Sequence, residues 1–71
     1  MKFEEVMPYM REGKKVIRKS LSHPIFISDY TNSFGETYKA FCFHGDKYIN
    51  YYEITQNDLF AEDWEVIGRV D

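Results

Sequence analysis

Cysteine is nearly absent from this 71-residue sequence, which contains only Cys42. One thiol can form no disulfide within the chain and no metal site built from several thiolates, and this composition is typical of proteins in a reducing cytosol. Cys42 stands between Phe41 and Phe43, so we expect it to be a small core residue rather than a reactive thiol.

Glycine is scarce as well, and its four residues stand singly along the chain. No glycine-rich loop is therefore present to hold the phosphates of a nucleoside triphosphate or a dinucleotide cofactor. His23 and His44 lack a partner at metal-ligand spacing, and no nucleophile elbow surrounds a serine. We expect no catalytic residues, no metal and no cofactor, which argues against NTPases, dinucleotide-dependent oxidoreductases and serine hydrolases.

Basic residues are in the minority, with 9 lysines and arginines against 12 acidic residues and a net charge of -3. This balance disfavours general binding to nucleic acid phosphates. The carboxylates of Glu62, Asp63 and Glu65 are predicted to be solvated charges. No apolar segment reaches the roughly 20 residues that span a bilayer, and the N-terminus has no signal-peptide pattern, so we expect a soluble cytoplasmic protein without a membrane partner.

Aromatic residues are abundant, at 18% of the chain, with six Phe, six Tyr and one Trp. A chain of 71 residues is near the lower limit for one domain with its own core, so we treat residues 1–71 as a single domain. So many rings in so small a volume must in part line a pocket, a groove or a subunit interface, and we expect a homo-oligomer. Trp64 is predicted to be a core or interface anchor.

The order of polar, apolar and turn-forming residues predicts an α+β domain, in which a short amphipathic helix precedes an antiparallel sheet of about five strands. Apolar side chains at helical spacing indicate a helix over residues 3–12, which should have a kink or an irregular second turn at Pro8 and end at Gly13. One short helical turn over residues 59–61, which Thr55, Asn57 or Asp58 can cap, precedes the last strand. The strands are predicted over residues 14–19, 25–28, 37–43, 47–54 and 63–69.

Two groups of side chains have the chemistry to bind a nucleotide-sized anion. Tyr48, Asn50 and Tyr52 share one face of the predicted fourth strand, where the rings can stack on a base and the amide can both donate and accept hydrogen bonds. Arg18 and Lys19, at the end of the first strand, supply cationic donors for phosphate. The rings could equally fill a subunit interface, and both roles are compatible if the pocket lies between subunits.

Both ends of the chain also resemble a known family. The matching residues are Phe3-x-x-Val6, Gly13-Lys14-Lys15-Val16-x-Arg18-Lys19, Asn50 and Thr55-Gln56-x-Asp58-Leu59-x-Ala61-x-Asp63-Trp64-Glu65. Together they are similar to the small phage-encoded Thoeris anti-defence proteins of the second type. The resemblance covers roughly half of the chain, and the segment from Gln56 to Trp64 is its most specific part.

The resemblance implies a non-enzymatic bacteriophage protein that forms homo-oligomers, described for the family as tetramers built from dimers. Such proteins act as sponges: they bind cyclic ADP-ribose-type signalling nucleotides, and some bind cyclic dinucleotides, before an immune effector of the infected bacterium senses them. The resemblance also implies a ligand-binding role for Asn50 and Arg18. We therefore expect a small cyclic nucleotide ligand and a dimer or tetramer in the cytoplasm of the infected bacterial host cell.

One position departs from the family pattern. Leu21 stands where the family commonly has a tryptophan shortly after the Arg-Lys pair. A missing stacking contact would remove about 1 to 3 kcal/mol of binding free energy unless Phe26, Tyr48 or Tyr52 replaces it. This departure favours an alternative hypothesis, in which the same fold inhibits a host defence protein by direct binding through its aromatic and acidic surface. A structural or regulatory phage protein without a ligand is the third hypothesis.

Overall fold

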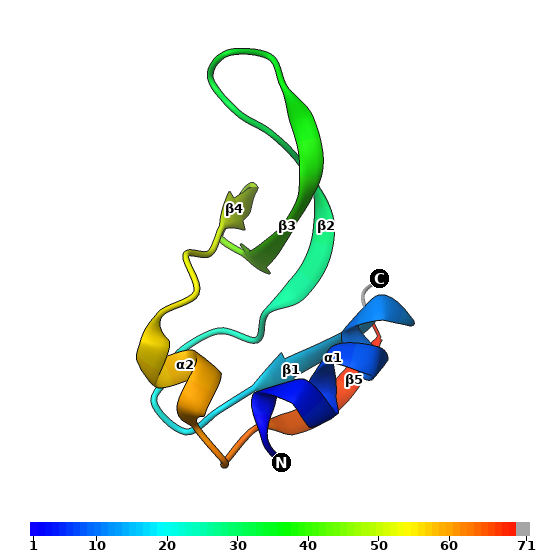
Figure 1. Cartoon of the computed structure of the whole chain (residues 1–71). Helices are drawn as coiled ribbons and strands as arrows, with labels where there is room; N and C mark the ends of the chain where they lie inside the picture. Colours follow the sequence, from blue (N-terminus) through cyan, green and yellow to red (C-terminus); the bar gives the residue numbers. More distant parts are fainter. Residues whose placement is uncertain (70–71) are drawn as a thin grey trace.

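The computed structural model describes residues 1–69, and it has the predicted α+β architecture. An N-terminal helix is followed by four strands, a short second helix and a last strand (Figure 1). The elements are α1 (Phe3–Arg11), β1 (Lys14–Ile17), β2 (Phe26–Thr31), β3 (Thr37–His44), β4 (Ile49–Tyr51), α2 (Gln56–Phe60) and β5 (Glu65–Arg69). Neither α1 nor α2 is long and apolar enough to cross a membrane.

Helix α1 forms because its apolar side chains recur at helical spacing and both of its ends are capped. The Glu5 carboxylate accepts a hydrogen bond from the Lys2 backbone N–H at 2.7 Å, which satisfies one of the donors that a helix start leaves without a partner. Gly13 follows the last turn at a φ of +90°, a conformation that glycine adopts without steric cost. Pro8 lies inside the helix, which continues without interruption from Phe3 to Arg11.

The five strands form two antiparallel sheets instead of the single sheet expected from the sequence. β1 pairs with β5, and β2, β3 and β4 form the second sheet in that order. An isolated bridge joins the sheets, with a hydrogen bond of 2.9 Å from the Val16 N–H to the Ile25 carbonyl. The chain returns to β1 because Trp64, directly before β5, is anchored by its backbone N–H to the Met1 carbonyl and by its ring N–H to the Asp58 carbonyl.

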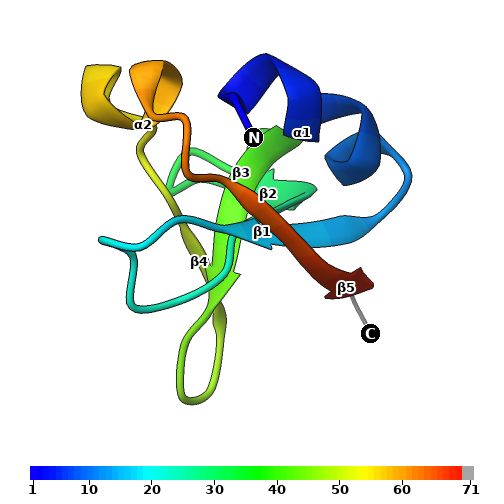
Figure 2. The ribbon, with the colours of Figure 1, turned by 90° about the horizontal axis from the view of Figure 1, so that it is seen from below.

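The hydrophobic core lies where α1 packs on the strands of both sheets. Six buried residues form it: Phe3, Val6, Met10, Val16, Ile25 and Trp64. The ring of Phe3 packs edge-on against Trp64, with 5.3 Å between the ring centroids. Trp64 is fully buried, which confirms its predicted role in the core. In Figure 2 the two helices lie side by side, with β1 and β5 beneath them.

Cys42 is buried in the second sheet, as its sequence context predicts. It pairs with Phe26 on the neighbouring strand β2, and Phe26 is fully buried as well. Burial raises the pKa of the Cys42 thiol, since the thiolate would lose its hydration. The residue is therefore a packed, protonated side chain at neutral pH rather than a nucleophile.

Strands β1 and β4 are shorter than predicted, and both differences move candidate binding residues out of the sheets, whereas β2 extends beyond its predicted end to Thr31. β1 stops before Arg18, because a turn begins there that is closed by the Leu21 N–H and the Arg18 carbonyl at 3.0 Å. β4 covers three residues instead of the predicted 47–54. The Gly45 N–H binds the Tyr48 carbonyl at 2.9 Å, and this bond holds Tyr48 in the hairpin loop before β4.

The β2–β3 hairpin projects from the body of the molecule as an arm (Figure 1). At its tip the side-chain oxygen of Asn32 accepts hydrogen bonds from the backbone N–H groups of Phe34 and Glu36, at 2.9 and 3.0 Å. This Asx-type turn keeps the loop in one conformation, and Gly35 supplies the positive φ of 82° that it needs. The arm contributes to an elongated shape with extents of 35 × 26 × 23 Å.

Candidate functional site

The candidate site is built around one buried carboxylate, that of Asp58 in α2. Its side chain is fully buried, and the Nε of Arg18 donates to its Oδ1 at 2.7 Å. The Tyr52 hydroxyl donates to Oδ2 at 2.8 Å, and the Thr55 backbone N–H donates to the same oxygen at 3.0 Å. Arg18 and Tyr52, two of the residues that the sequence proposes for ligand binding, therefore meet at one carboxylate.

The local sequence explains why α2 presents this carboxylate. Thr55 is the N-cap of the helix, and its Oγ1 accepts a hydrogen bond from the Asp58 backbone N–H at 3.2 Å. Because Asp58 also binds the Thr55 N–H, the two residues form a capping box. The Trp64 Nε1 donates to the Asp58 carbonyl at 2.8 Å. Asp58 is consequently held through its backbone as well as its side chain.

These contacts set the ionisation of Asp58 and Tyr52. Burial alone would raise the pKa of Asp58, but hydrogen bonds from the Thr55 backbone, Tyr52 and Arg18 outweigh burial and hold the pKa below its ordinary value. Burial and the bond to the charged Asp58 raise the pKa of Tyr52 to about 12. At neutral pH Asp58 is ionised and the Tyr52 hydroxyl is committed to it, so the ring is the part of Tyr52 that remains for a ligand.

Two shallow hollows lie beside this cluster and meet at Leu21. Arg18, Lys19 and Leu21 line the first, which has a volume of about 160 Å³. Leu21, Phe43 and Tyr52 line the second, of about 80 Å³. We call the two together the Leu21 groove. Small-molecule pockets usually measure about 300–1,000 Å³, so neither hollow of a single chain encloses a nucleotide.

The first hollow carries charges of both signs. Arg18 and Lys19 share it with Asp63 and Glu65, and the Asp63 carboxylate accepts a hydrogen bond from the Lys19 backbone N–H at 3.1 Å. This balance favours recognition through direct hydrogen bonds over long-range attraction of an anion. Among residues 1–69 the Arg18 side chain makes no hydrogen bond other than the one from Nε, so its Nη groups are available to a ligand.

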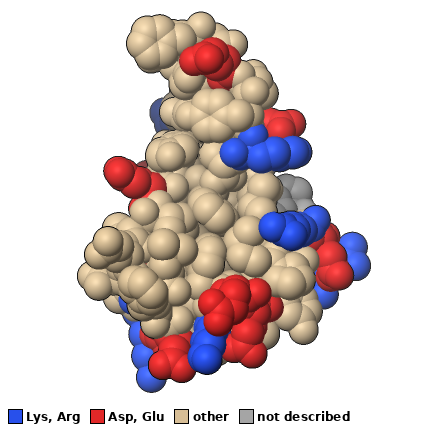
Figure 3. Space-filling model, viewed as in Figure 1, with Lys and Arg blue, Asp and Glu red and all other residues tan. Residues whose placement is uncertain are grey.

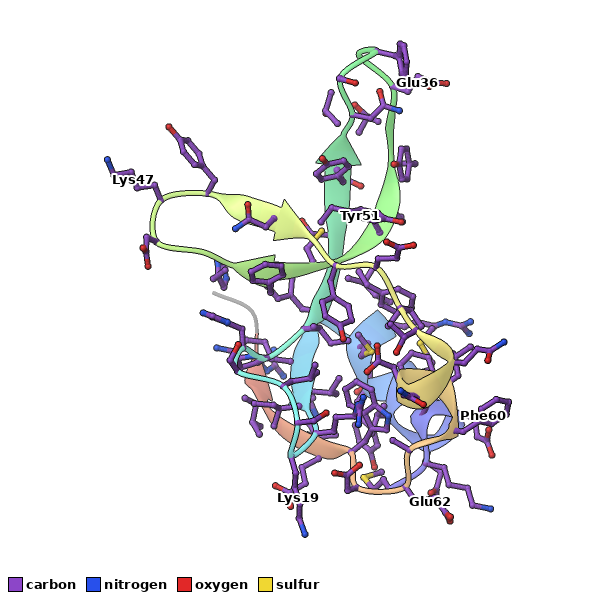
Figure 4. All side chains as sticks on the ribbon, turned by 90° about the vertical axis from the view of Figure 1, so that its left-hand side faces the viewer. Lys19, Glu36, Lys47, Tyr51, Phe60 and Glu62 are labelled. Carbon is purple, nitrogen blue, oxygen red and sulfur yellow. The ribbon has the colours of Figure 1, made fainter. Side chains whose placement is uncertain are left out.

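The remaining two candidates, Tyr48 and Asn50, are not among the residues that line the Leu21 groove. Of the predicted face, only Asn50 belongs to β4, where it pairs with Phe43 and donates its amide to the Tyr48 carbonyl at 3.3 Å. Tyr48 itself is 76% exposed in the hairpin loop. Figure 4 shows Lys47, the neighbour of Tyr48, at the upper left of the molecule and Lys19 at its lower end. Within residues 1–69, therefore, neither Asn50 nor Tyr48 lines the groove of its own chain.

The metal-binding and histidine side chains are the next features to place. No group of three His, Cys, Asp or Glu side chains within residues 1–69 is arranged to hold a metal ion. His23 shares a hydrogen bond of 2.9 Å with the hydroxyl of its neighbour Ser22, and both side chains are exposed. His44 is exposed at the end of β3 instead of in the predicted turn. Both histidines are therefore surface residues, as the sequence predicts.

Asp58 is the site residue that sequence reasoning missed. The sequence offers it only as one of three possible caps of a helical turn over residues 59–61. In the structure α2 begins earlier, Thr55 is its N-cap, and Asp58 completes the capping box. Its ion pair with Arg18 joins positions 40 residues apart, and no local pattern encodes such a contact. The one feature of the sequence that could have pointed to Asp58 as a site residue is its place in the segment from Gln56 to Trp64, the most specific part of the family resemblance.

A second notable surface is the aromatic face of the β2–β3–β4 sheet, which comprises Tyr30, Tyr38, Ile49 and Tyr51. The Tyr30 ring lies 6.1 Å from Tyr38 and 5.3 Å from Tyr51, measured between centroids. Tyr38, Ile49 and Tyr51 are each more than two-fifths exposed. Figure 3 shows that uncharged side chains cover most of the middle of the molecule on the side seen in Figure 1. Exposed apolar surface of this kind is typical of interaction sites.

Comparison with known protein families agrees with the resemblance at the two ends of the sequence. The family model described as the Thoeris anti-defense 2-like domain matches residues 1–67. No curated protein matches the sequence. The matched range contains both helices, the Asp58 cluster and the Leu21 groove, and it supports a role in opposing Thoeris defence. The chain therefore belongs to the Thoeris anti-defense 2-like family.

Proposed function

We propose that this protein binds and sequesters a cyclic nucleotide immune signal, of the cyclic ADP-ribose type or a cyclic dinucleotide, without cleaving it. The observation that carries the proposal is the meeting of Arg18 and Tyr52 at Asp58, beside a groove, in a chain of an anti-defence family. A guanidinium binds phosphate oxygens and an aromatic ring stacks on a base. A ligand with phosphate and base thus finds both partners side by side.

Each residue of the Leu21 groove has a distinct part in this proposal. Arg18 binds a phosphate oxygen through its Nη groups, and Lys19 adds a second cation. Tyr52 and Phe43, whose rings meet edge-on at 6.4 Å, offer the apolar contact for a base or ribose. Leu21 supplies no aromatic stacking, so these two rings take over the role that a tryptophan has in relatives with the common pattern.

The binding form in this proposal is a homo-oligomer, either a dimer or a tetramer. The larger hollow of the Leu21 groove measures about 160 Å³, about half of the lower limit for small-molecule pockets, so another chain must supply further walls. The aromatic face offers an apolar contact surface for that chain. Tyr48 and Asn50, which do not line the groove of their own chain, would then join the groove of a partner.

Capture is stoichiometric in this proposal. A sponge works by mass action: it must bind the signal below the concentration that activates the host effector, and it must be made in excess of the signal. No catalytic group is needed, and the family assignment supports a non-catalytic role. The place of action is the cytoplasm of the infected bacterial cell, where the signal is produced.

Thermal unfolding against a panel of nucleotides tests the proposal. The panel contains cyclic ADP-ribose, its ribose-linked isomers, cyclic di-AMP and cyclic di-GMP. A nucleotide present at 100 times its Kd stabilises the native state by about 2.7 kcal/mol, which corresponds to about 11–22 °C in Tm for a domain of this size. Release of the unaltered nucleotide on heating distinguishes capture from cleavage, and a flat response to a saturating panel would overturn the proposal.

The alternative function is direct inhibition of a Thoeris protein, and the exposed phenylalanines favour it. Phe34 at the tip of the arm is 87% exposed, and Phe60 in α2 is 79% exposed. Exposed large rings are typical anchors of protein interfaces. In gel filtration with purified Thoeris proteins, an inhibitor would co-elute with one of them. The Phe34→Ser or Phe60→Ser variant would no longer co-elute. A sponge would elute alone and leave the enzyme active on added signal.

A further inference from the structure

We infer that Asp58 is a positioning residue for ligand capture, which holds the Arg18 guanidinium and the Tyr52 ring in the orientation in which they bind the nucleotide. The inference rests on the proposed function, because it explains how the Leu21 groove is kept ready for its ligand. Asp58 itself is fully buried and does not reach the ligand. Its effect on binding passes through the two side chains that it holds.

Asp58 is a fixed point in the molecule, which a positioning residue must be. Its carboxylate has donors on both oxygens, with Arg18 on Oδ1 and both Tyr52 and Thr55 on Oδ2. Its backbone is held by Thr55 at the start of α2 and by the ring of the buried Trp64. Because every polar atom of this side chain is restrained, it can hold the side chains that bind it in one orientation.

The bond to Asp58 orients Arg18 without using up its binding capacity. Arginine has five N–H donors, and Asp58 takes the one on Nε. The four N–H groups on the two Nη atoms remain for phosphate oxygens, in a plane that the Nε bond defines. A free arginine would have to lose its rotamer freedom on binding, whereas this one has lost it on folding, so its phosphate contact is preorganised.

The same carboxylate fixes the aromatic part of the groove. The Tyr52 hydroxyl is tied to Oδ2, and its ring stands at 86° to that of Phe43. Arg18 lines the hollow on one side of Leu21 and Tyr52 lines the hollow on the other. A single residue thus sets the relative position of a cation and a ring, which is the geometry that a base and its phosphate require.

Four variants test this inference by isothermal calorimetry: Asp58→Asn, Arg18→Gln, their combination, and Asp29→Asn as the matched control. The probe is the panel nucleotide that binds the unchanged protein most tightly. Asparagine has nearly the same volume as aspartate but lacks the negative charge that pairs with Arg18. We therefore expect Asp58→Asn to weaken binding by about 10- to 100-fold. Asp29 also pairs with a cation, Lys39, at 3.0 Å on the exposed surface, and its loss should leave the Kd unchanged.

The combined variant separates positioning from general damage. Because Asp58 acts through Arg18 as well as Tyr52, the double variant should lose less binding free energy than the sum of the two single losses, and Asp58→Asn should reduce the salt dependence of binding as Arg18→Gln does. Additive losses with an unchanged salt dependence in Asp58→Asn would overturn the inference, since they indicate a structural role alone. Unchanged affinity in Asp58→Asn, with binding intact in the parent, would overturn it as well and leave the proposed function standing. Absence of binding in the parent would defeat both.

A measurement on the unchanged protein covers the case in which Asp58→Asn does not fold. The Arg18 Nε–H signal in nitrogen-edited NMR reports the bond to Asp58, and the Nη signals report contact with the probe. We expect the Nε–H to stay protected from solvent exchange before and after the probe is added, while the Nη signals shift. Loss of Nε–H protection on binding would show that Arg18 leaves Asp58 to bind, and would overturn the inference.

Discussion

The ion pair between Arg18 and Asp58 should account for a large share of the stability of this small domain. Replacing Arg18 by Met keeps the apolar stem of the side chain and removes the charge. The buried Asp58 carboxylate then keeps two donors, the Tyr52 hydroxyl and the Thr55 backbone N–H. Breaking a buried pair by removing one partner typically costs about 3–5 kcal/mol. Because two donors remain, we expect the lower end, a loss of about 3 kcal/mol in the free energy of unfolding.

The size of the domain makes this loss easy to measure. At about 0.05–0.15 kcal/mol per residue, a chain of 71 residues has a total stability of about 4–11 kcal/mol. A loss of about 3 kcal/mol corresponds to a fall in Tm of about 12–24 °C for a domain of 60–100 residues. Urea unfolding followed by circular dichroism measures the free energy, and a thermal scan at the same protein concentration measures Tm.

The matched control is Lys39→Met, which breaks an ion pair on the surface. Lys39 and Asp29 are also close, at 3.0 Å, but their side chains are 74% and 66% exposed, and pairs of this kind contribute about 0.2–1 kcal/mol. The two ion pairs have similar N–O distances but differ in burial, so comparing the two variants isolates the effect of burial. An Arg18→Met variant that is no less stable than Lys39→Met would refute the reasoning about the Asp58 cluster.

The other predictions concern single bonds of the same structure. The folded-state pKa of Asp58 is lowered, so its contribution to stability is present above the ordinary pKa of about 3.9 and is lost as the pH falls below that value. In Asp58→Asn, acid unfolding should lack the loss of stability that protonation of Asp58 causes. Tyr52 should titrate at about pH 12, later than an ordinary tyrosine, so its stabilisation is lost as the pH rises toward that value, and Tyr52→Phe should remove the late phase from a phenolate absorbance titration. Trp64→Phe leaves the Asp58 carbonyl without its ring N–H donor and should cost about 1–3 kcal/mol in urea unfolding. Gly13→Ala should cost about 1–2 kcal/mol, since the φ of +90° is strained for alanine although nothing lies within 4 Å of the added methyl group.

The sequence by itself determined the features that depend on neighbours in the chain. The helical spacing of Phe3, Val6 and Met10 with a glycine after the last turn predicts α1, and the structure agrees within one residue at its end. Thr55, Asn57 and Asp58 likewise predict a helical turn before the last strand, over residues 59–61, but the structure begins α2 earlier, at Gln56, because Thr55 is the cap. The motif residues at the two ends also identified the family, which the match over residues 1–67 confirms.

Only the tertiary structure decided which distant segments meet. It paired β5 with β1 instead of adding it to one continuous sheet, and it brought Arg18 to Asp58 across 40 positions. It also shortened β4 at both ends and kept Tyr48 and Asn50 out of the lining of the Leu21 groove, although alternation along a strand had grouped them with Tyr52. Contacts of this kind depend on which apolar faces pack together and on which buried charge finds a partner, and these are properties of the whole folded chain that no local pattern encodes.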